Sequence, residues 1–264
     1  MLQYQVGCEL DYCAYGPSTF IFNVAGCQNK YQYLIDEQYT TTPTLPWQEY
    51  SLAGEPNRYF RLNAPAGLLR VKYSGILKVN RPLPHPADQG YTAPAQLPCP
   101  VIHYLYPSRY CQSDLLLNFA QGEFGQWEPG YAQVAAICDW IYQKVLYLPG
   151  SSDSFTSATE TLLKRVGVCR DFAHLGVALC RALNIPARFV SGYAHGLNPP
   201  DFHAWFEAYL GQEWCQFDPS RLVPPQGLVQ VGVGRDAADV AVATILGAVT
   251  LHRFQVLIEP LSCP

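Results

Sequence analysis

The stretch Gly167-Val168-Cys169-Arg170-Asp171-Phe172-Ala173 indicates how the second half of the chain folds. Gly167 ends a short helical pattern, and the apolar residues after it recur at helical spacing. The sequence therefore predicts a helix that begins at or near Cys169 and ends at about Leu183. A thiol at a helix start faces unpaired backbone N–H groups and the positive end of the helix dipole, and both favour the thiolate. Cys169 is a candidate nucleophile, and a buried structural cysteine is the alternative.

Two stretches of alternating residues on either side of Leu210-Gly211 predict a β-hairpin after this helix. If Leu210-Gly211 is a two-residue turn, His203 lies directly opposite Asp218, with Cβ atoms about 4.5 to 5.5 Å apart. A longer turn pairs Asp218 with Trp205 instead, and His203 becomes a diagonal neighbour about 7 to 8 Å away. In both registers Asp218 can orient His203.

Cys169, His203 and Asp218 would then supply the nucleophile, the general base and the orienting acid of cysteine catalysis. A structural hydrogen bond between His203 and Asp218, beside a buried thiol, is the competing interpretation. We expect non-catalytic roles for the nearby residues. His174 fits core or surface packing, and Asp171 makes a favourable contact with the helix dipole. Glu207 lies about 13 Å along the strand from His203, which is too far for a shared role, whereas Trp205 and Trp214 fit core packing and Cys180 and Cys215 fit apolar filling.

The whole chain divides by pattern into three parts. Residues 1–80 carry short apolar or alternating runs cut by turn residues, and they predict a small antiparallel β-sandwich with a structural or recognition role. Residues 81–107 are rich in proline and predict an extended surface linker. Residues 108–264 predict an α+β catalytic domain that includes a helix at Tyr131–Tyr142 and a C-terminal β extension. The candidate strands of the first part are Gln3–Cys8, Thr19–Val24, Tyr31–Ile35, Arg58–Leu62 and Leu69–Val79.

The composition narrows the class of protein. Hydrophobic residues make up 49% of the 264 positions and aromatic residues 13%, which argues against disorder. No run reaches the roughly 18 apolar residues of a membrane-spanning helix. The formal charge of −4 offers no basic footprint for nucleic acid or an anionic membrane surface.

Cysteine and histidine usage gives expectations about metals and location. None of the ten cysteines forms a Cys-x-x-Cys motif and the six histidines are scattered, so we expect no metal site and no cofactor. The first residues contain neither a basic nor an apolar export segment. We therefore expect a reducing cytoplasm with free thiols.

Ordered motifs from about Tyr106 to Arg221 resemble those of the bacterial transglutaminase-like superfamily. The motifs are Ser157-Ala158, Gly167-Val168-Cys169-Arg170-Asp171-Phe172-Ala173, Arg181-Ala182-Leu183-Asn184-Ile185-Pro186-Ala187-Arg188, Val190-Ser191-Gly192-Tyr193, His203-Ala204-Trp205 and Phe217-Asp218-Pro219. The stretch Gly234-Arg235-Asp236-Ala237-Ala238-Asp239-Val240 is similar to the Gly-Arg-Asp segment that follows the core domain in these proteins. Residues 1–80 resemble the small β domain that often precedes it.

The resemblance implies a papain-like α+β core in which Cys169 is the nucleophile, His203 the general base and Asp218 the orienting acid. It implies attack on an amide carbonyl of a peptide or protein substrate. Water would complete hydrolysis, as in a peptidase or amidase, and a second amine would complete transamidation. The sequence does not separate these outcomes, although the absence of an evident calcium loop argues against a calcium-switched crosslinker. A non-catalytic binding or scaffolding module is the third alternative.

Overall fold

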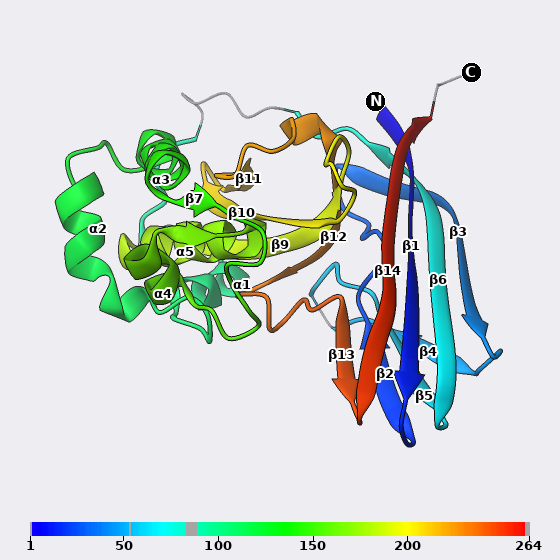
Figure 1. Cartoon of the computed structure of the whole chain (residues 1–264). Helices are drawn as coiled ribbons and strands as arrows, with labels where there is room; N and C mark the ends of the chain where they lie inside the picture. The colour runs from blue at the N-terminus through cyan, green and yellow to red at the C-terminus, as the bar shows by residue number, and fades with distance from the viewer. Residues whose placement is uncertain (1, 53, 83–88, 262–264) are drawn as a thin grey trace.

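The chain forms two lobes, a β-sandwich and a mixed lobe of helices around a sheet (Figure 1). The computed structural model describes residues 2–52, 54–82 and 89–261. Two four-stranded antiparallel sheets make up the sandwich, in the orders β14-β1-β6-β3 and β13-β2-β5-β4. Their strands are β1 (Leu2–Ala14), β2 (Ser18–Phe22), β3 (Gln32–Thr42), β4 (Trp47–Tyr50), β5 (Tyr59–Ala64), β6 (Gly67–Val79), β13 (Ala243–Leu246) and β14 (Val249–Leu261).

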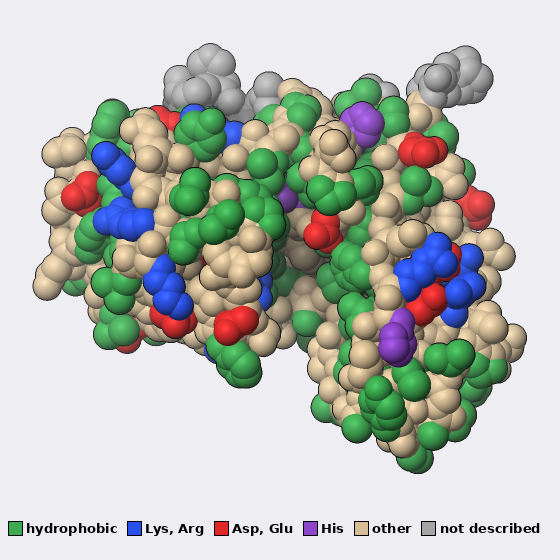
Figure 2. Space-filling view, in the orientation of Figure 1, with side chains coloured by type: hydrophobic (Ala, Val, Ile, Leu, Met, Phe, Trp, Pro, Cys, Tyr) green, Lys and Arg blue, Asp and Glu red, His purple; other side chains and the backbone are tan. Residues whose placement is uncertain are grey.

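Period-two alternation builds the sandwich, as β6 illustrates. Leu69 and Val71 are buried between the sheets, whereas Arg70 and Lys72 lie on the outer face. There both cations form ion pairs with Glu9 of β1. Figure 2 shows a cluster of blue and red side chains on the sandwich lobe. The predicted antiparallel sandwich is therefore confirmed.

The last two strands complete the sandwich and take no part in the sheet of the mixed lobe. β14 pairs along the whole of β1, and β13 pairs with β2. The C-terminal β extension that we assigned to the catalytic domain, residues 108–264, thus lies in the sheets of the N-terminal lobe. The assignment failed because alternation shows that a segment is a strand and not which strand it pairs with. The domain boundaries themselves stay a prediction.

Part of the proline-rich linker is helical rather than extended. α1 (Cys99–Ile102) begins with Pro100 in its first turn, where proline is tolerated because that N–H has no intrahelical acceptor. Val101 packs with Leu97 against the buried Tyr209 of the mixed lobe, so this segment is partly internal. Residues 83–88 of the predicted linker, with Pro84 and Pro86, lie outside the described residues.

The mixed lobe packs its central helix, α5, against an antiparallel sheet ordered β11-β10-β9-β12. Gly176 of α5 allows this contact, because a Cβ atom there would lie 2.4 Å from the ring of Phe206 on β10. The strands are β7 (Leu146–Tyr147), β8 (Val166–Gly167), β9 (Ala187–Ala194), β10 (Phe202–Leu210), β11 (Glu213–Phe217) and β12 (Leu228–Gly234). The central helix α5 spans Cys169–Ala182. Besides α1 and α5, the helices are α2 (Leu117–Phe124), α3 (Tyr131–Lys144), α4 (Ala158–Lys164), and the short 3-10 helices η2 (Pro94–Gln96), η3 (His103–Leu105), η4 (Ser113–Leu115) and η5 (Pro225–Gly227).

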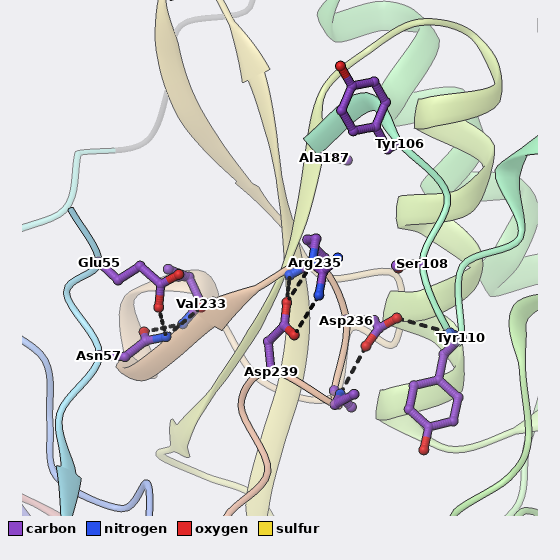
Figure 3. Close-up of polar contacts among 12 residues, drawn as sticks. Glu55, Asn57, Tyr106, Ser108, Tyr110, Ala187, Val233, Arg235, Asp236 and Asp239 are labelled. Carbon is purple, nitrogen blue, oxygen red and sulfur yellow. Dashed lines mark hydrogen bonds and ion pairs between the residues drawn. The ribbon is translucent and has the colours of Figure 1, made fainter. Parts of the chain in front are cut away.

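Buried amides join the two lobes. Gln32 of β3 exchanges hydrogen bonds of 2.7 and 2.8 Å with the backbone of Gln230 on β12. Asn57 does the same with Val233, with both bonds at 2.7 Å (Figure 3). Both side-chain amides are almost fully buried. Because an unpaired buried amide is costly, these exchanges fix the orientation of the sandwich on the sheet of the mixed lobe.

Candidate active site

Cys169 is the first residue of α5, as predicted, and its side chain is partly exposed. The helix begins here because the buried carboxylate of Asp171 turns back and accepts the N–H of Val168 at 2.9 Å. This contact satisfies one donor and places a negative charge at the positive end of the helix. Asp171 therefore sets the helix start, in agreement with the non-catalytic role expected for it.

The register of the hairpin differs from the first of the two predicted registers. The turn residues are Gly211 and Gln212, both at positive φ, of 54° and 66°, so Tyr209 pairs with Trp214. Such turns match the twist of a hairpin, and glycine adopts the first of these angles without strain. The first register, with Leu210-Gly211 as the turn and His203 directly opposite Asp218, was therefore wrong, and the observed register is the second, in which His203 is a diagonal neighbour of Asp218.

His203 and Asp218 nevertheless meet. The paired part of β11 ends before Asp218, and this residue reaches diagonally to His203 with 2.8 Å between Oδ2 and Nε2. Its other oxygen, Oδ1, accepts the backbone N–H of Ser220 at 2.9 Å and the hydroxyl of Ser220 at 2.6 Å. Both carboxylate oxygens are thus engaged, and the orientation of the group is fixed.

The electrostatics of His203 depend on both partners. Burial alone would lower the pKa of this imidazole, but hydrogen bonds and charges from Asp218 and Cys169 outweigh burial and raise the pKa to about 10. Because Nε2 is bound to Asp218, Nδ1 is the ring nitrogen that remains for the thiol. Asp218 is thus in direct contact with His203, and Cys169 is near enough to His203 to act on its pKa, so the three predicted residues lie close together.

Tyr147 also lies at this helix start. β7 and β8 pair in parallel, which places Tyr147 opposite Gly167, and its ring packs against Phe172 with 5.6 Å between centroids. Burial and then the neighbouring Cys169 raise the pKa of Tyr147 far above neutral pH. Its hydroxyl therefore stays protonated and can donate a hydrogen bond close to the thiol.

Sequence reasoning missed Tyr147 and Ser220. A two-residue parallel pairing gives no periodic signal, so nothing in the sequence connects Tyr147 with Cys169. Ser220 did carry a signal, because an aspartate often accepts a hydrogen bond from the backbone two residues later. The spacing of Asp218 and Ser220 fits that pattern.

Two residues to which we assigned no catalytic role, His174 and Glu207, have structural partners. His174 is fully buried, stacks on Tyr110 and accepts the N–H of Ala237 at 3.1 Å. Burial, followed by nearby arginine charges, lowers the pKa of His174 and keeps the ring neutral. Glu207 is fully buried and paired with Arg81 at 2.5 Å and Arg188 at 2.6 Å.

The remaining tryptophans and cysteines of this region are mostly packing residues. Trp205 is buried beside His203, and Trp214 packs edge-on against Tyr209. The nine described cysteines are free, and burial raises the pKa of four of them to about 12: Cys8, Cys27, Cys111 and Cys215. Such thiols are unreactive near neutral pH.

The Gly-Arg-Asp segment supports the central helix. Asp236 accepts the N–H groups of Tyr110 and Ala238, both at 2.9 Å, and Arg235 pairs with Asp239 (Figure 3). The carbonyl of Arg235 in turn accepts a 2.6 Å hydrogen bond from Arg181 of α5. The segment is therefore part of the scaffold of the site.

Within residues 2–52, 54–82 and 89–261, no group of three or more His, Cys, Asp or Glu side chains could hold a metal ion. None of the helices in these ranges is long and apolar enough to cross a membrane.

The central helix begins with a cysteine and packs against a sheet whose strands position a histidine and an aspartate. This arrangement is that of a transglutaminase-like fold, and the sequence matches the same family. Residues 118–219 match the transglutaminase-like superfamily, and residues 2–80 match the bacterial transglutaminase N-terminal domain. The chain belongs to the transglutaminase-like superfamily.

Similar proteins come from several bacteria. The crystal structure of a candidate cysteine protease from Cytophaga hutchinsonii is 44% identical, with a TM-score of 0.95, over 100% of this chain and 92% of that one. An uncharacterized protein of Mycobacterium bovis is 32% identical over 71% of this chain and 67% of its own length. An uncharacterized protein of Mycobacterium leprae is 39% identical, and the match spans 43% of each chain.

Proposed function

We propose that this protein is a cysteine-dependent amide hydrolase, a peptidase or amidase, that acts through a thioester on Cys169. The observation that carries the proposal is the 2.8 Å contact between His203 and Asp218, close to Cys169 at the start of α5. All three side chains are of the types that thiol catalysis requires. The family membership and the likeness to a candidate cysteine protease support the same class of reaction.

The reaction has two halves. The Cys169 thiolate attacks the amide carbonyl, the C–N bond breaks, and the leaving amine takes a proton from His203, which leaves a thioester. His203 then removes a proton from water, the hydroxide attacks the thioester, and the carboxylic acid leaves as the thiol is restored. Asp218 holds the imidazole in orientation and stabilises its charged form throughout.

Two donors are suited to the negative oxygen that forms during each attack. The backbone N–H of Cys169 lies at the start of α5, where helix amides have no intrahelical acceptor. The neutral hydroxyl of Tyr147, held beside Cys169, is the second donor in our proposal. Preorganised donors of this kind commonly contribute about a hundredfold or more each to the rate.

Transamidation is the enzymatic alternative, because it uses the same thioester and differs only in whether an amine or water attacks it. A binding or scaffolding module is the alternative from another class. The proximity of Cys169 to the hydrogen-bonded pair of His203 and Asp218 favours an enzyme over a binding module without catalysis.

Intact-mass analysis during incubation with peptide libraries, with and without a primary amine, tests these alternatives. We expect a transient adduct on Cys169 and cleaved peptide whether or not the amine is present, and neither in Cys169→Ala. Amine-dependent product at the expense of acid would replace hydrolysis with transamidation. Alkylation by iodoacetamide provides the check against a scaffold: Cys169 should react well below pH 8, and His203→Ala should move its profile to higher pH.

The setting of the reaction is also part of the proposal. We infer a peptide or protein substrate, no cofactor, and a reducing cytoplasm in which Cys169 stays a free thiol, with no nucleic-acid or membrane partner. The formal charge of −4 and the free state of the nine described cysteines support this setting.

A further inference from the structure

A second carboxylate, Asp201, lies beside the His203 side of the site and belongs to none of the contacts above. It immediately precedes β10 and stands two residues before His203, so strand alternation puts both side chains on one face, about 7 Å apart along the strand. One oxygen, Oδ1, accepts the N–H of Phe202 at 2.7 Å. Asp201 is accessible to solvent although neighbouring groups partly cover its carboxylate, and no ion pair to Asp201 occurs among the described residues.

The charge of Asp201 is felt by Tyr147, and the charge of His203 is felt by Asp201. Burial and Cys169, and then Asp201, raise the pKa of Tyr147. Burial also raises the pKa of Asp201 itself, while the Phe202 amide and the charge of His203 oppose that rise. Asp201 is thus close enough to feel His203 and to act on Tyr147, which stands next to the thiol.

The other charges of the site are already compensated. Asp218 is bound by His203 and Ser220, and Asp171 is bound by the N–H of Val168. The guanidinium of Arg170 contacts the Asp153 carbonyl and Asp171. Asp201 therefore contributes a negative charge that a ligand can neutralise.

Asp201 follows a residue that lines a groove of the sandwich. Pro200 borders this groove of about 590 Å³, which residues of β1, β3, β6 and β14 form; Asp201 and Cys169 do not line it. Phe202 contacts Phe254 of β14, with ring centroids 5.8 Å apart. Asp201 thus stands where the site meets the sandwich, and Figure 2 shows acidic and histidine side chains in the furrow between the lobes.

We propose that Asp201 is a specificity-determining residue that binds a cationic side chain of the substrate, of the lysine or arginine type, within about two residues of the scissile amide. The span follows from the 7 Å between Asp201 and His203 and the rise of about 3.3 Å per residue in an extended peptide. This inference rests on the proposed function for its substrate, a peptide. The cation-binding property itself can be measured without turnover.

Charged thiol reagents provide that measurement. Aminoethyl and sulfonatoethyl methanethiosulfonate are similar in size and opposite in charge, and peptide mapping reports the rate of labelling at Cys169. We expect Asp201→Asn to lower the cation-to-anion rate ratio about three- to tenfold at low salt, as the loss of one nearby, partly screened charge requires. Asp201→Lys should lower it further.

A matched control separates local from overall charge. Asp36→Asn removes the same unit charge from an exposed residue of β3, at the sheet edge opposite β14. The ratio should not change in Asp36→Asn. An unchanged ratio in Asp201→Asn, or an equal change in both variants, would overturn the cation subsite.

Paired peptides test the specificity itself. We expect the wild-type kcat/KM for a peptide with lysine near the scissile bond to exceed that for its norleucine counterpart by about fivefold or more, and the preference to fall to near one in Asp201→Asn. Cleavage with no such preference would refute the subsite and leave the hydrolase intact. A labelling bias in a protein that cleaves no peptide would refute the hydrolase and leave the cation-binding site.

Discussion

Asp218→Asn is the substitution that most directly tests how the site works. Asparagine has nearly the shape of aspartate, and its carbonyl oxygen can still accept both hydrogen bonds from Ser220 that Oδ1 accepts now. The amide nitrogen of asparagine then replaces Oδ2, which lies 2.8 Å from Nε2 of His203, so both the negative charge and the hydrogen-bond acceptor are lost. The change therefore removes the electrostatic support of the imidazolium and leaves the fold in place.

The magnitude follows from that one contact. A hydrogen bond to a charged group contributes about 1.5 to 3 kcal/mol, and little screening reduces it here, because the side chain of His203 is 0% exposed and that of Asp218 is 7% exposed. At about 1.4 kcal/mol per decade, kcat/KM should fall roughly tenfold to 150-fold. Burial would then dominate at His203, and its pKa should fall from about 10 toward or below the ordinary value of 6.5.

Peptide hydrolysis together with pH-dependent alkylation of Cys169 measures both effects. In Asp218→Asn the alkylation profile should move to higher pH as hydrolysis falls. Ser220→Ala is the graded control: it removes the 2.6 Å bond to Oδ1 but keeps the charge, so its loss should be only severalfold. Full activity in Asp218→Asn, or equal losses in both variants, would refute the assignment of Asp218 as the residue that supports His203.

Three further changes test other parts of the structure. Tyr147→Phe should lower kcat by about tenfold to a hundredfold with little change in KM, since it removes a donor used only when the oxyanion forms; an unchanged kcat would exclude the hydroxyl from that role. Arg181→Lys should lower the free energy of unfolding by about 2 to 4 kcal/mol in urea titrations. Lysine cannot reproduce the five hydrogen bonds that Arg181 makes to Ala187, Tyr106, Ser108 and Arg235. A loss below about 0.5 kcal/mol would contradict this role. The pKa of His203 is raised by folding, so its contribution to stability is complete below about pH 6.5 and is lost as pH rises through about 10; the urea midpoint should fall across that range, and less steeply in His203→Ala.

Local patterns predicted the central helix and indicated Cys169, His203 and Asp218 as candidate site residues. The spacing of apolar residues after Gly167 fixed α5 to within one residue at its C-terminal end, and Cys169 is its first residue as expected. His203 and Asp218 could be proposed as neighbours because alternation along a strand is also a local property and both candidate turns bring the two residues close together. Within such segments, neighbouring residues largely decide the structure.

Features that depend on distant contacts were not predictable in the same way. Leu210-Gly211 and Gly211-Gln212 are both acceptable as turns by composition, and only the packing of the whole hairpin selects the second. Tyr147 reaches Cys169 through a two-residue parallel pairing that leaves no pattern in the sequence. The buried amide of Asn57 binds the backbone of Val233, a residue far away in the sequence, and no local pattern connects the two.

The N-terminal region cannot complete the β-sandwich alone, because the chain returns to the sandwich at its C-terminal end. β1 lies between β6 and β14, and β2 lies between β5 and β13, so residues 2–80 leave two interior strands without one neighbour each. The mixed lobe is inserted between the two parts of the sandwich, and its β12 hydrogen-bonds to Gln32 and Asn57. A fragment of residues 2–80 would expose the edge of β1, a long strand that readily pairs with other chains. The sandwich therefore requires the C-terminal strands, and the position of β14 beside Phe202 ties the completion of the sandwich to the geometry of the site.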